Sequence, residues 1–261
     1  MLKSSDLRFL ILATFWACIF LAGCGLASTP LPPLGPTLTP LPTSTPTPTV
    51  IWFPPTATFT PFPTPVISPT LDLSPPIGDL LFEDDFSDPS PWLLSQSETA
   101  SVALGNSALT LALDQPDGYL YTLRKSPLLD DLYIEVTASP SLCRGEDEYG
   151  LLLRVSKSLD FFRFSLSCDG HVRLDKYVNG KASSPVPRTL SGAFPPGAPT
   201  SSRLAVWANG KEMRFYINDE FQFAIKDPTL LQGSLGFFIR SAGENALTVS
   251  FSDLIVRKVL D

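Results

Sequence analysis

From about Asp79 to the end of the sequence, apolar residues recur at every second position in one short segment after another. Successive side chains of a β-strand point to opposite sides, so this period is typical of strands with one buried and one exposed face. A helix would repeat every three to four residues, and no such period occurs in this part of the sequence. The alternating segments are 133–138, 149–155, 161–166, 171–177, 204–208, 213–217, 221–225, 235–239 and 247–256. The alternation therefore predicts an all-β fold.

Turns that contain glycine separate several of these segments. Asp169-Gly170, Asn179-Gly180 and Asn209-Gly210 each lie between two of them, and Asn-Gly favours the left-handed backbone angles of tight hairpins. Hairpin connections make neighbouring strands antiparallel. About a dozen short strands without helices predict a two-sheet antiparallel β-sandwich of the jelly-roll type.

The sequence before Asp79 has a different composition. Proline and threonine dominate it, and Asp72 is the only charged residue between Gly25 and Gly78. Proline lacks an amide donor, and no apolar period builds a face that a core could bury. We therefore expect residues 24–78 to be a disordered tether and residues 79–261 to be the β-sandwich domain. In polyproline II geometry a tether of this length reaches on the order of 150 Å.

The first residues are typical of an export signal. Lys3 and Arg8 precede an apolar run from Phe9 to Ala22. This run is shorter than the about 20 apolar residues that a helix usually needs to span a membrane. The run ends in Leu21-Ala22-Gly23-Cys24, which resembles the lipobox of bacterial lipoproteins. That resemblance implies removal of residues 1–23, a diacylglycerol on Cys24 and an extracytoplasmic protein held on a membrane by lipid. The alternatives are an ordinary signal peptide or a single membrane helix.

This interpretation of the first residues assigns a role to each of the four cysteines. Cys18 leaves with the signal and Cys24 carries the lipid, so Cys143 and Cys168 are left as a pair. Outside the cytoplasm a disulfide is the natural expectation, with two unpaired thiols as the alternative. Cys143 follows one predicted strand and Cys168 ends another two strands later, so we expect both at one end of the same sheet.

Several segments carry a resemblance to a known superfamily. They are Leu81-Phe82-Glu83-Asp84-Asp85-Phe86-Ser87 with Pro91-Trp92, Tyr149-Gly150-Leu151-Leu152-Leu153-Arg154, Phe161-Phe162-Arg163-Phe164, Arg203-Leu204-Ala205-Val206, Phe215-Tyr216-Ile217-Asn218 and Phe251-Ser252-Asp253-Leu254-Ile255-Val256. Their order along the chain resembles that of concanavalin A-like lectin/glucanase domains, including laminin G-like modules and 3-keto-disaccharide hydrolases. The superfamily contains enzymes, binding modules and domains without a known ligand, so the resemblance implies the fold rather than the activity.

No catalytic constellation is recognisable. Glucanases of this superfamily carry a glutamate, an aspartate two residues on and a second glutamate shortly after, and this pattern is missing from the sequence. Retaining hydrolysis needs two carboxyl groups about 5.5 Å apart. The densest acidic group, Glu146-Asp147-Glu148, falls in a predicted loop, and we interpret it as solvated charge. His171 is the only histidine, and we expect it to be exposed at a turn.

The resemblance implies one possible metal site, because several members of the superfamily bind calcium with oxygen ligands near the terminal strands or at a rim of the sandwich. Asp84, Asp85 and Asp253 are the candidate ligands. Alternatively, these carboxylates cap turns or accept hydrogen bonds from neighbouring amides. Motifs for other metals or for cofactors are missing from the sequence, so we expect no cofactor.

A ligand, if one binds, is expected on the solvent-facing side of a curved sheet. Six residues share the out-facing phase of successive segments, namely Tyr133, Glu135, Arg154, Arg163, Arg173 and Tyr177. Arginine and glutamate supply charge-assisted hydrogen bonds, and tyrosine supplies a flat platform for a sugar ring. The alternative is a ladder of cross-strand pairs, such as Glu135 with Arg154 or Arg163, that only solvates the face. Trp207, Tyr216 and Phe238 share a second out-facing phase, which we expect to lie under a loop such as 191–200.

Charge narrows the classes of partner. The formal net charge of −7 argues against nucleic acid and against adhesion to anionic lipid. The leading hypothesis is a membrane-tethered, noncatalytic module that binds a carbohydrate or another surface partner. The alternatives are an enzyme similar to the 3-keto-disaccharide hydrolases, with Glu135 as acid or base, and a structural lipoprotein without a small-molecule ligand. The sequence does not indicate an oligomeric state.

Overall fold

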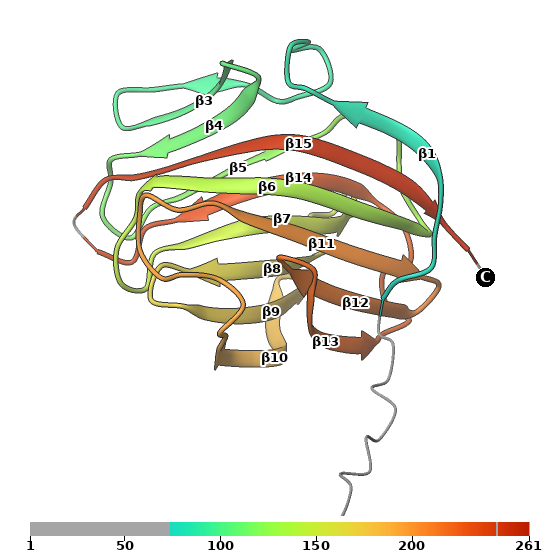
Figure 1. The fold of residues 1–261 in the computed structure, drawn as a ribbon. Coiled ribbons are helices and arrows are strands. Elements are labelled where there is room, and N and C mark those ends of the chain that lie inside the picture. The colour runs from blue at the N-terminus through green and yellow to red at the C-terminus, as the bar shows by residue number, and fades with distance from the viewer. Residues whose placement is uncertain (1–73, 244, 261) are drawn as a thin grey trace, which may run out of the picture. The chain divides into compact units, whose positions relative to one another are not determined.

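The alternating segments form strands throughout the part of the chain that the structure describes, residues 74–243 and 245–260 (Figure 1). The structure is a computed structural model. The predicted signal peptide, Cys24 and residues 25–73 of the predicted tether lie outside the described residues. The first strand begins at Ile77, two residues before the boundary expected at Asp79. Within the described residues there is no helix, and therefore none that is long and apolar enough to cross a membrane.

The strands pair into two antiparallel sheets. The nine-stranded sheet has the order β13 (Glu220–Lys226), β12 (Glu212–Ile217), β11 (Ser202–Asn209), β6 (Leu132–Leu142), β15 (Leu247–Val259), β4 (Ala108–Leu113), β3 (Ala100–Gly105) and β2 (Ser95–Gln96), and β1 (Ile77–Asp84) also pairs with β15. The six-stranded sheet has the order β10 (Lys181–Leu190), β9 (His171–Val178), β8 (Phe161–Ser167), β7 (Glu148–Val155), β14 (Ser234–Arg240) and β5 (Tyr119–Leu123).

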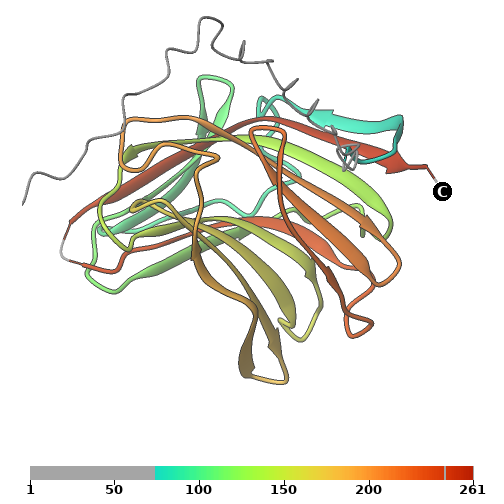
Figure 2. The same cartoon turned by 60° about the horizontal axis from the view of Figure 1, so that its bottom comes forward.

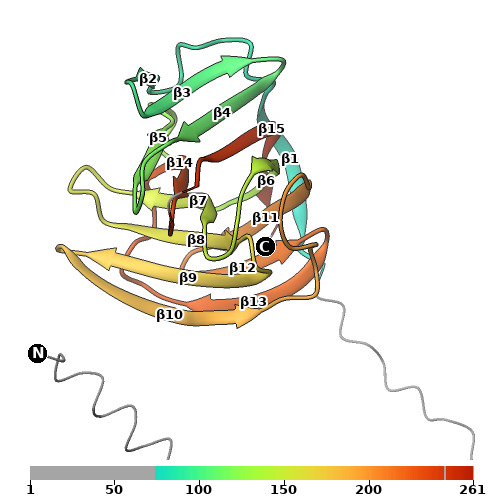
Figure 3. The same ribbon diagram turned by 90° about the vertical axis from the view of Figure 1, so that its left-hand side faces the viewer.

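The two sheets lie face to face as the layers of a sandwich. Figure 2 shows them as two curved layers, and Figure 3 shows β2, β3 and β4 at the end of the sandwich opposite β10 and β13. The connections after β4, β5, β6, β10, β13 and β14 each carry the chain from one sheet to the other. The predicted all-β, two-sheet antiparallel sandwich is therefore confirmed.

Apolar side chains from the inner faces of both sheets fill the space between the layers. Phe237 of β14 stacks on Phe251 of β15 with ring centroids 4.4 Å apart, and on Trp92 at 5.0 Å. Phe164 of β8 packs against Phe215 of β12 at 5.0 Å. These rings are fully buried, and truncating one such aromatic residue typically costs about 3–5 kcal/mol of folding free energy.

The predicted disulfide between Cys143 and Cys168 is present, with their Cα atoms 5.8 Å apart. Its place differs from the expectation that both cysteines lie on one sheet. Cys143 follows β6 of the nine-stranded sheet, and Cys168 follows β8 of the six-stranded sheet. Because the chain changes layers between β6 and β7, the disulfide links the two layers of the sandwich.

The Asn179-Gly180 turn behaves as its composition predicts. It joins β9 to β10, and its residues have φ values of 50° and 71°. Two consecutive positive φ angles are the signature of a type I′ hairpin turn, whose twist matches that of the strands. The turn thus sets the register in which Lys181 pairs with Val178 and Ala182 with Tyr177.

Candidate functional site

The outer face of the six-stranded sheet combines buried charge with exposed aromatic rings. On this face the register sets Tyr119 of β5 beside Arg240 of β14, and Arg240 beside Glu148 of β7. Five side chains form what we call the charged cluster: Glu148, Arg163, Arg173, Asp175 and Arg240. Five more form the aromatic shelf: Tyr119, Tyr121, Phe161, Tyr177 and Phe238.

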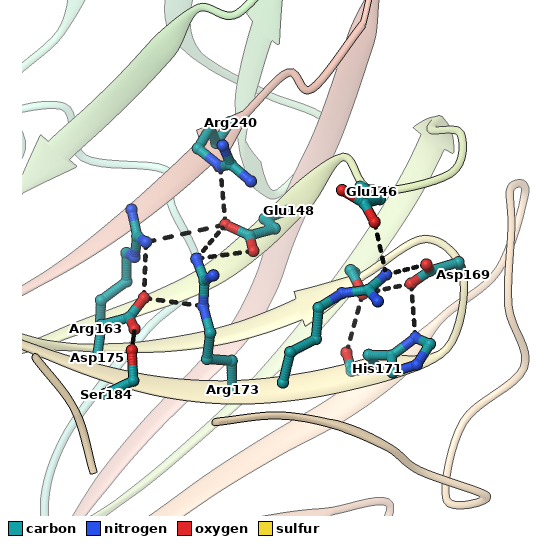
Figure 4. Close-up of polar contacts among 11 residues, drawn as sticks. Glu146, Glu148, Arg163, Asp169, His171, Arg173, Asp175, Ser184 and Arg240 are labelled. Atoms are coloured by element: carbon teal, nitrogen blue, oxygen red, sulfur yellow. Dashed lines mark hydrogen bonds and ion pairs between the residues drawn. The ribbon is translucent and has the colours of Figure 1, made fainter. Parts of the chain in front are cut away.

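Glu148 is the centre of the charged cluster. Figure 4 shows it between the guanidinium groups of Arg240, Arg173 and Arg163. One carboxylate oxygen accepts from Arg240 Nε at 2.9 Å, the other is paired with Arg173 Nη2 at 2.9 Å, and Arg163 Nη2 lies 3.9 Å away. Each guanidinium comes from a different strand, so the cluster connects β7, β8, β9 and β14.

Asp175 is the second acid of the cluster. It accepts from Arg163 Nη2 at 2.7 Å, lies 2.9 Å from Arg173 Nε, and accepts from the Ser184 hydroxyl at 2.6 Å. Both acids are buried, with Glu148 3% and Asp175 4% exposed. Burial opposes the charged form of Arg163, but the hydrogen bond to Asp175 raises the pKa of the guanidinium above its ordinary value. The buried acids and Arg163 therefore neutralise and hold one another.

Two small residues make room for the cluster. Gly150 of β7 and Ser165 of β8 are cross-strand partners on this face, and Ser165 is the partner of Arg173. A Cβ on Gly150 would stand 2.0 Å from the carbonyl oxygen of Phe164, so only glycine fits there. With no bulk at these positions, long guanidinium side chains can lie over the sheet.

The aromatic shelf adjoins the cluster through Arg163. Its guanidinium carbon lies 5.2 Å from the ring centroid of Tyr177, 5.4 Å from that of Phe238 and 5.9 Å from that of Tyr119. Tyr119 stacks on Phe238 at 5.7 Å. Desolvation raises the pKa of Tyr119 to about 12, so its hydroxyl stays protonated at neutral pH. Tyr119 and Tyr121 are each 40% exposed, so their rings are accessible from solvent.

A small apolar hollow of about 70 Å³ lies on the shelf. Its lining residues are Tyr119, Tyr121, Leu123, Leu152, Val155, Leu159 and Phe161. A shallower hollow of about 370 Å³ continues from it and shares Leu123, Val155 and Leu159. The outer face of this sheet thus offers an apolar recess on one side and guanidinium groups on the other.

Three of the six residues predicted to share a face are brought together here. On the outer face of β8 and β9 lie Arg163, Arg173 and Tyr177. Arg163 pairs with Asp175 within the charged cluster and also lies over the ring of Tyr177 on the aromatic shelf. The other three lie elsewhere.

Tyr133 and Glu135 belong to β6, which is in the nine-stranded sheet. The Tyr133 hydroxyl donates to Glu135 at 2.7 Å, and Arg203 lies 3.8 Å from the same carboxylate. Burial, with the bond to Glu135, raises the pKa of Tyr133. The expected pairing of Glu135 with Arg154 or Arg163 is therefore wrong, because β6 and β7 lie in different layers.

Arg154 is redirected by a β-bulge. The register between β7 and β14 shifts where Leu152 and Val155 pair with Gly236 and Ser234, so β7 has one extra residue there. Arg154, with φ 51°, donates to the carbonyl oxygen of Leu230 at 2.9 Å and lines a small cavity between the sheets. The bulge removes it from the outer face.

The acidic run 146–148 is not a solvated loop, contrary to the sequence-based interpretation. Glu146 is exposed, but Asp147 is buried and accepts hydrogen bonds at 2.9 Å from the amides of Arg144 and Ala242. Glu148 begins β7 and enters the charged cluster. The amide of Ala242 and the guanidinium partners are distant in sequence, so the acidic run itself gave no sign of its burial.

His171 lies in a second polar group on the same face (Figure 4). Its Nδ1 is 3.0 Å from Asp169, which also pairs with Arg188. Asp169 is partly desolvated, yet hydrogen bonds from Ser167, His171 and Arg188 lower its pKa overall. His171 is half-buried at the start of β9 rather than free at a turn.

The second predicted aromatic group is divided between the sheets. Trp207 and Tyr216 are buried with Tyr133 on the outer face of the nine-stranded sheet, and Trp207 Nε1 donates to the carbonyl oxygen of Pro76 at 3.3 Å. Phe238 lies on the six-stranded sheet. The chain entering β1, rather than the loop 191–200, thus supplies the contact over Trp207.

The three carboxylates considered for calcium have separate roles. Asp84 accepts from the amide of Phe86 at 2.9 Å and from Trp92 Nε1 at 3.0 Å, whereas Asp85 and Asp253 bond Ser87 and Ser252. In residues 74–243 and 245–260, no group of three or more His, Cys, Asp or Glu side chains is arranged to hold a metal ion. Asp84 and Asp85 thus accept from amides of the turn after β1, as the alternative describes, whereas Asp253 accepts from a neighbouring hydroxyl within β15.

No family model matches the chain, and no curated protein matches it in sequence. Solved structures share its fold. A protein of unknown function with a galectin-like fold from Bacillus subtilis is 14% identical, with a TM-score of 0.54 over 70% of this chain and 98% of that one. The carbohydrate binding module CBM66 from Bacillus subtilis is 17% identical, with a TM-score of 0.51 over 64% and 96%. The laminarinase catalytic domain from Thermotoga petrophila is 9% identical, with a TM-score of 0.52 over 71% and 100%. The fold is thus that of concanavalin A-like and galectin-like β-sandwiches.

Proposed function

We propose that the domain is a noncatalytic carbohydrate-binding module and that it binds its glycan on the outer face of the six-stranded sheet. The observation that carries the proposal is the direct pairing of Tyr119 with Arg240. An accessible ring and a guanidinium with a 36% exposed side chain stand side by side on a stiff sheet. The similarity to a carbohydrate binding module and to laminarinases supports the fold for such a role, but the side chains support the role itself.

This pairing matches the two surfaces of a sugar ring. The C–H face of a pyranose is apolar and packs on an aromatic ring, whereas its hydroxyl groups at the edge form hydrogen bonds. Tyr119 and Tyr121 supply rings beside the apolar hollow. Arg240, the cross-strand partner of Tyr119, supplies hydrogen-bond donors next to these rings. Arg173 supplies further donors from β9, on the far side of the small residues Gly150 and Ser165.

The arrangement of the acids supports binding rather than hydrolysis. A retaining glycosidase needs one carboxylate free to attack and a carboxylic acid free to protonate the leaving oxygen. On this face Glu148 contacts three guanidinium groups, and Asp175 contacts two and a hydroxyl. Both acids are therefore committed to holding the arginines in place.

A glycan panel tests the function. The full chain, solubilised in a non-ionic detergent, is tested against neutral and acidic polysaccharides by affinity electrophoresis, together with Tyr119→Ala. We expect retardation by at least one polysaccharide, and about a tenfold weaker interaction for Tyr119→Ala, since an aromatic platform contributes on the order of 1–2 kcal/mol. Arg203→Gln, on the other sheet, is the control and should bind as the wild type does. No retardation by any polysaccharide would refute the proposal and favour a structural role.

We further propose that the protein is extracytoplasmic and anchored through a lipid on Cys24, which lies outside the described residues. The support is the sequence Leu21-Ala22-Gly23-Cys24 after an apolar run. Two or more acyl chains suffice to hold a protein on a bilayer, at about 0.8 kcal/mol per buried CH₂. Mass spectrometry of the membrane fraction should find Cys24 as an acylated first residue. A Cys24→Ser variant should lose the acyl mass, and an unmodified Cys24 in the wild type would contradict the proposal.

A further inference from the structure

We infer that the glycan bound by the charged cluster and aromatic shelf is acidic, with a carboxylate that pairs with Arg240 and Arg173 while its ring lies on Tyr119, an inference that rests on the proposed function. The distinction matters because the fold alone allows neutral and acidic ligands alike.

The first support is the balance of charge in the cluster. Three guanidinium groups face two carboxylates, so one positive charge is not matched within the cluster. The neighbouring group is paired separately, since Arg188 contacts Asp169 and Glu146. A ligand that brings one negative charge would complete the pairing at the place where sugar rings can stack.

The second support is the direction in which donors remain. Arg240 uses Nε for Glu148, and no described residue is a partner of its Nη1 and Nη2 atoms. In Figure 4 the one dashed line drawn from Arg240 runs to Glu148. A guanidinium edge with two parallel N–H groups is the geometry that binds a planar carboxylate in a bidentate manner.

The third support is the shortage of acceptors on the face. The oxygens of Glu148 and Asp175 are buried and already accept from arginines. A surface rich in donors and poor in acceptors favours a ligand group that only accepts, as an ionised carboxylate does.

The fourth support concerns selectivity. The whole chain carries a formal net charge of −7, so a polyanion is repelled by the protein in general. Binding of an acidic glycan would therefore depend on this local cluster rather than on a diffuse positive surface, and single substitutions in it should be decisive.

Polygalacturonate and its methyl ester test the inference, because they share one sugar and differ in whether the carboxylate is free. Using the full chain in detergent, we expect polygalacturonate to bind at least about tenfold more tightly than the ester, as is typical of charge-assisted hydrogen bonds. Added salt should weaken binding to polygalacturonate more than binding to the ester. Dextran sulfate carries sulfate groups in place of carboxylates, so it should bind less tightly than polygalacturonate if the site is specific for a carboxylate and not for anions in general.

Arg240→Gln should reduce the affinity for polygalacturonate by about tenfold and that for the methyl ester by clearly less, because the ester loses a hydrogen bond to a neutral group and polygalacturonate loses one to a charged group. Arg240→Lys, which keeps the charge but loses the two-pronged edge, should fall between the two. Arg203→Gln is the matched control on the other sheet, and thermal unfolding checks that each variant is folded.

Equal binding of the ester, or tighter binding of dextran sulfate than of polygalacturonate, would overturn the inference. The proposed function would survive either result if Tyr119→Ala still weakened the interaction. If no glycan of the panel binds, the proposed function itself fails.

Discussion

The outer faces of the two sheets contain the same kinds of residue in different states. On the nine-stranded sheet, Arg214 lies 4.5 Å from the ring centroid of Trp207, but Trp207 itself is buried and bonded to Pro76. On the six-stranded sheet, Arg163 lies 5.9 Å from the ring centroid of Tyr119, and the rings of Tyr119 and its neighbour Tyr121 remain accessible. Arginine beside an aromatic ring is thus not enough to make a site. What separates the two faces is whether another part of the chain covers the rings.

The largest difference between the faces should appear in their acids. Glu148→Gln leaves Arg163, Arg173 and Arg240 without their shared buried carboxylate, and breaking a buried ion pair typically costs about 3–5 kcal/mol. Glu135→Gln, on the other face, should cost on the order of 1 kcal/mol, because its carboxylate is partly exposed and its main partner is a tyrosine hydroxyl. Chemical denaturation of both variants measures the difference. Equal losses would show that the charged cluster has no special role in stability.

Removing an aromatic ring should cost more stability on the nine-stranded sheet and more glycan binding on the six-stranded sheet. Trp207→Ala removes a buried ring, so we expect the free energy of unfolding to fall by about 3 kcal/mol while glycan binding is retained. Tyr119→Ala should lower stability much less, since its ring is partly exposed, and should weaken binding. Denaturation and affinity electrophoresis on the same two variants provide the comparison. A loss of binding in folded Trp207→Ala would move the site to the other sheet.

The smallest effect concerns pH. The pKa of Asp169 is lowered in the folded protein, so its stabilising contribution is complete above the pKa of the unfolded chain, near 3.8. That contribution is lost as the pH falls through the lower folded value. Asp169→Asn should therefore lower the free energy of unfolding at neutral pH by less than about 1 kcal/mol, because the group is partly exposed, and the difference should shrink as the pH falls below 3.8. A difference that stays constant down to acid pH would show that the charge of Asp169 is not the cause.

Parts of the site could have been read from the alternation itself. The segment 235–239 alternates with Phe238 facing out, so Arg240 two residues later must also face out, and the structure puts Arg240 in the charged cluster. Tyr119 and Tyr121 alternate in the same way at β5. The signal for these residues was present, but a segment of five residues with two tyrosines does not stand out among loops.

Other parts had no signal in the sequence. The period of two separates inner from outer side chains, but it does not say in which sheet a strand lies. Tyr133 and Arg163 therefore shared a predicted phase although β6 and β8 belong to different layers. The bulge that turns Arg154 inward, and the long-range partners that bury Glu148, depend on pairing between segments distant in the sequence.

The sequence by itself predicted that this domain is all-β and which side of each alternating segment faces the core, because alternation and turn residues act locally. It also predicted the pair of Cys143 and Cys168, through the interpretation of the first residues as a lipoprotein signal, and the structure contains that disulfide. Only the tertiary structure decided which outward side chains meet, since neighbours in a sheet are chosen by strand order rather than by distance along the chain. The candidate site is made of five strands, which lie side by side in the order β9-β8-β7-β14-β5. In the sequence, the segment from Tyr119 to Arg240 is 122 residues long.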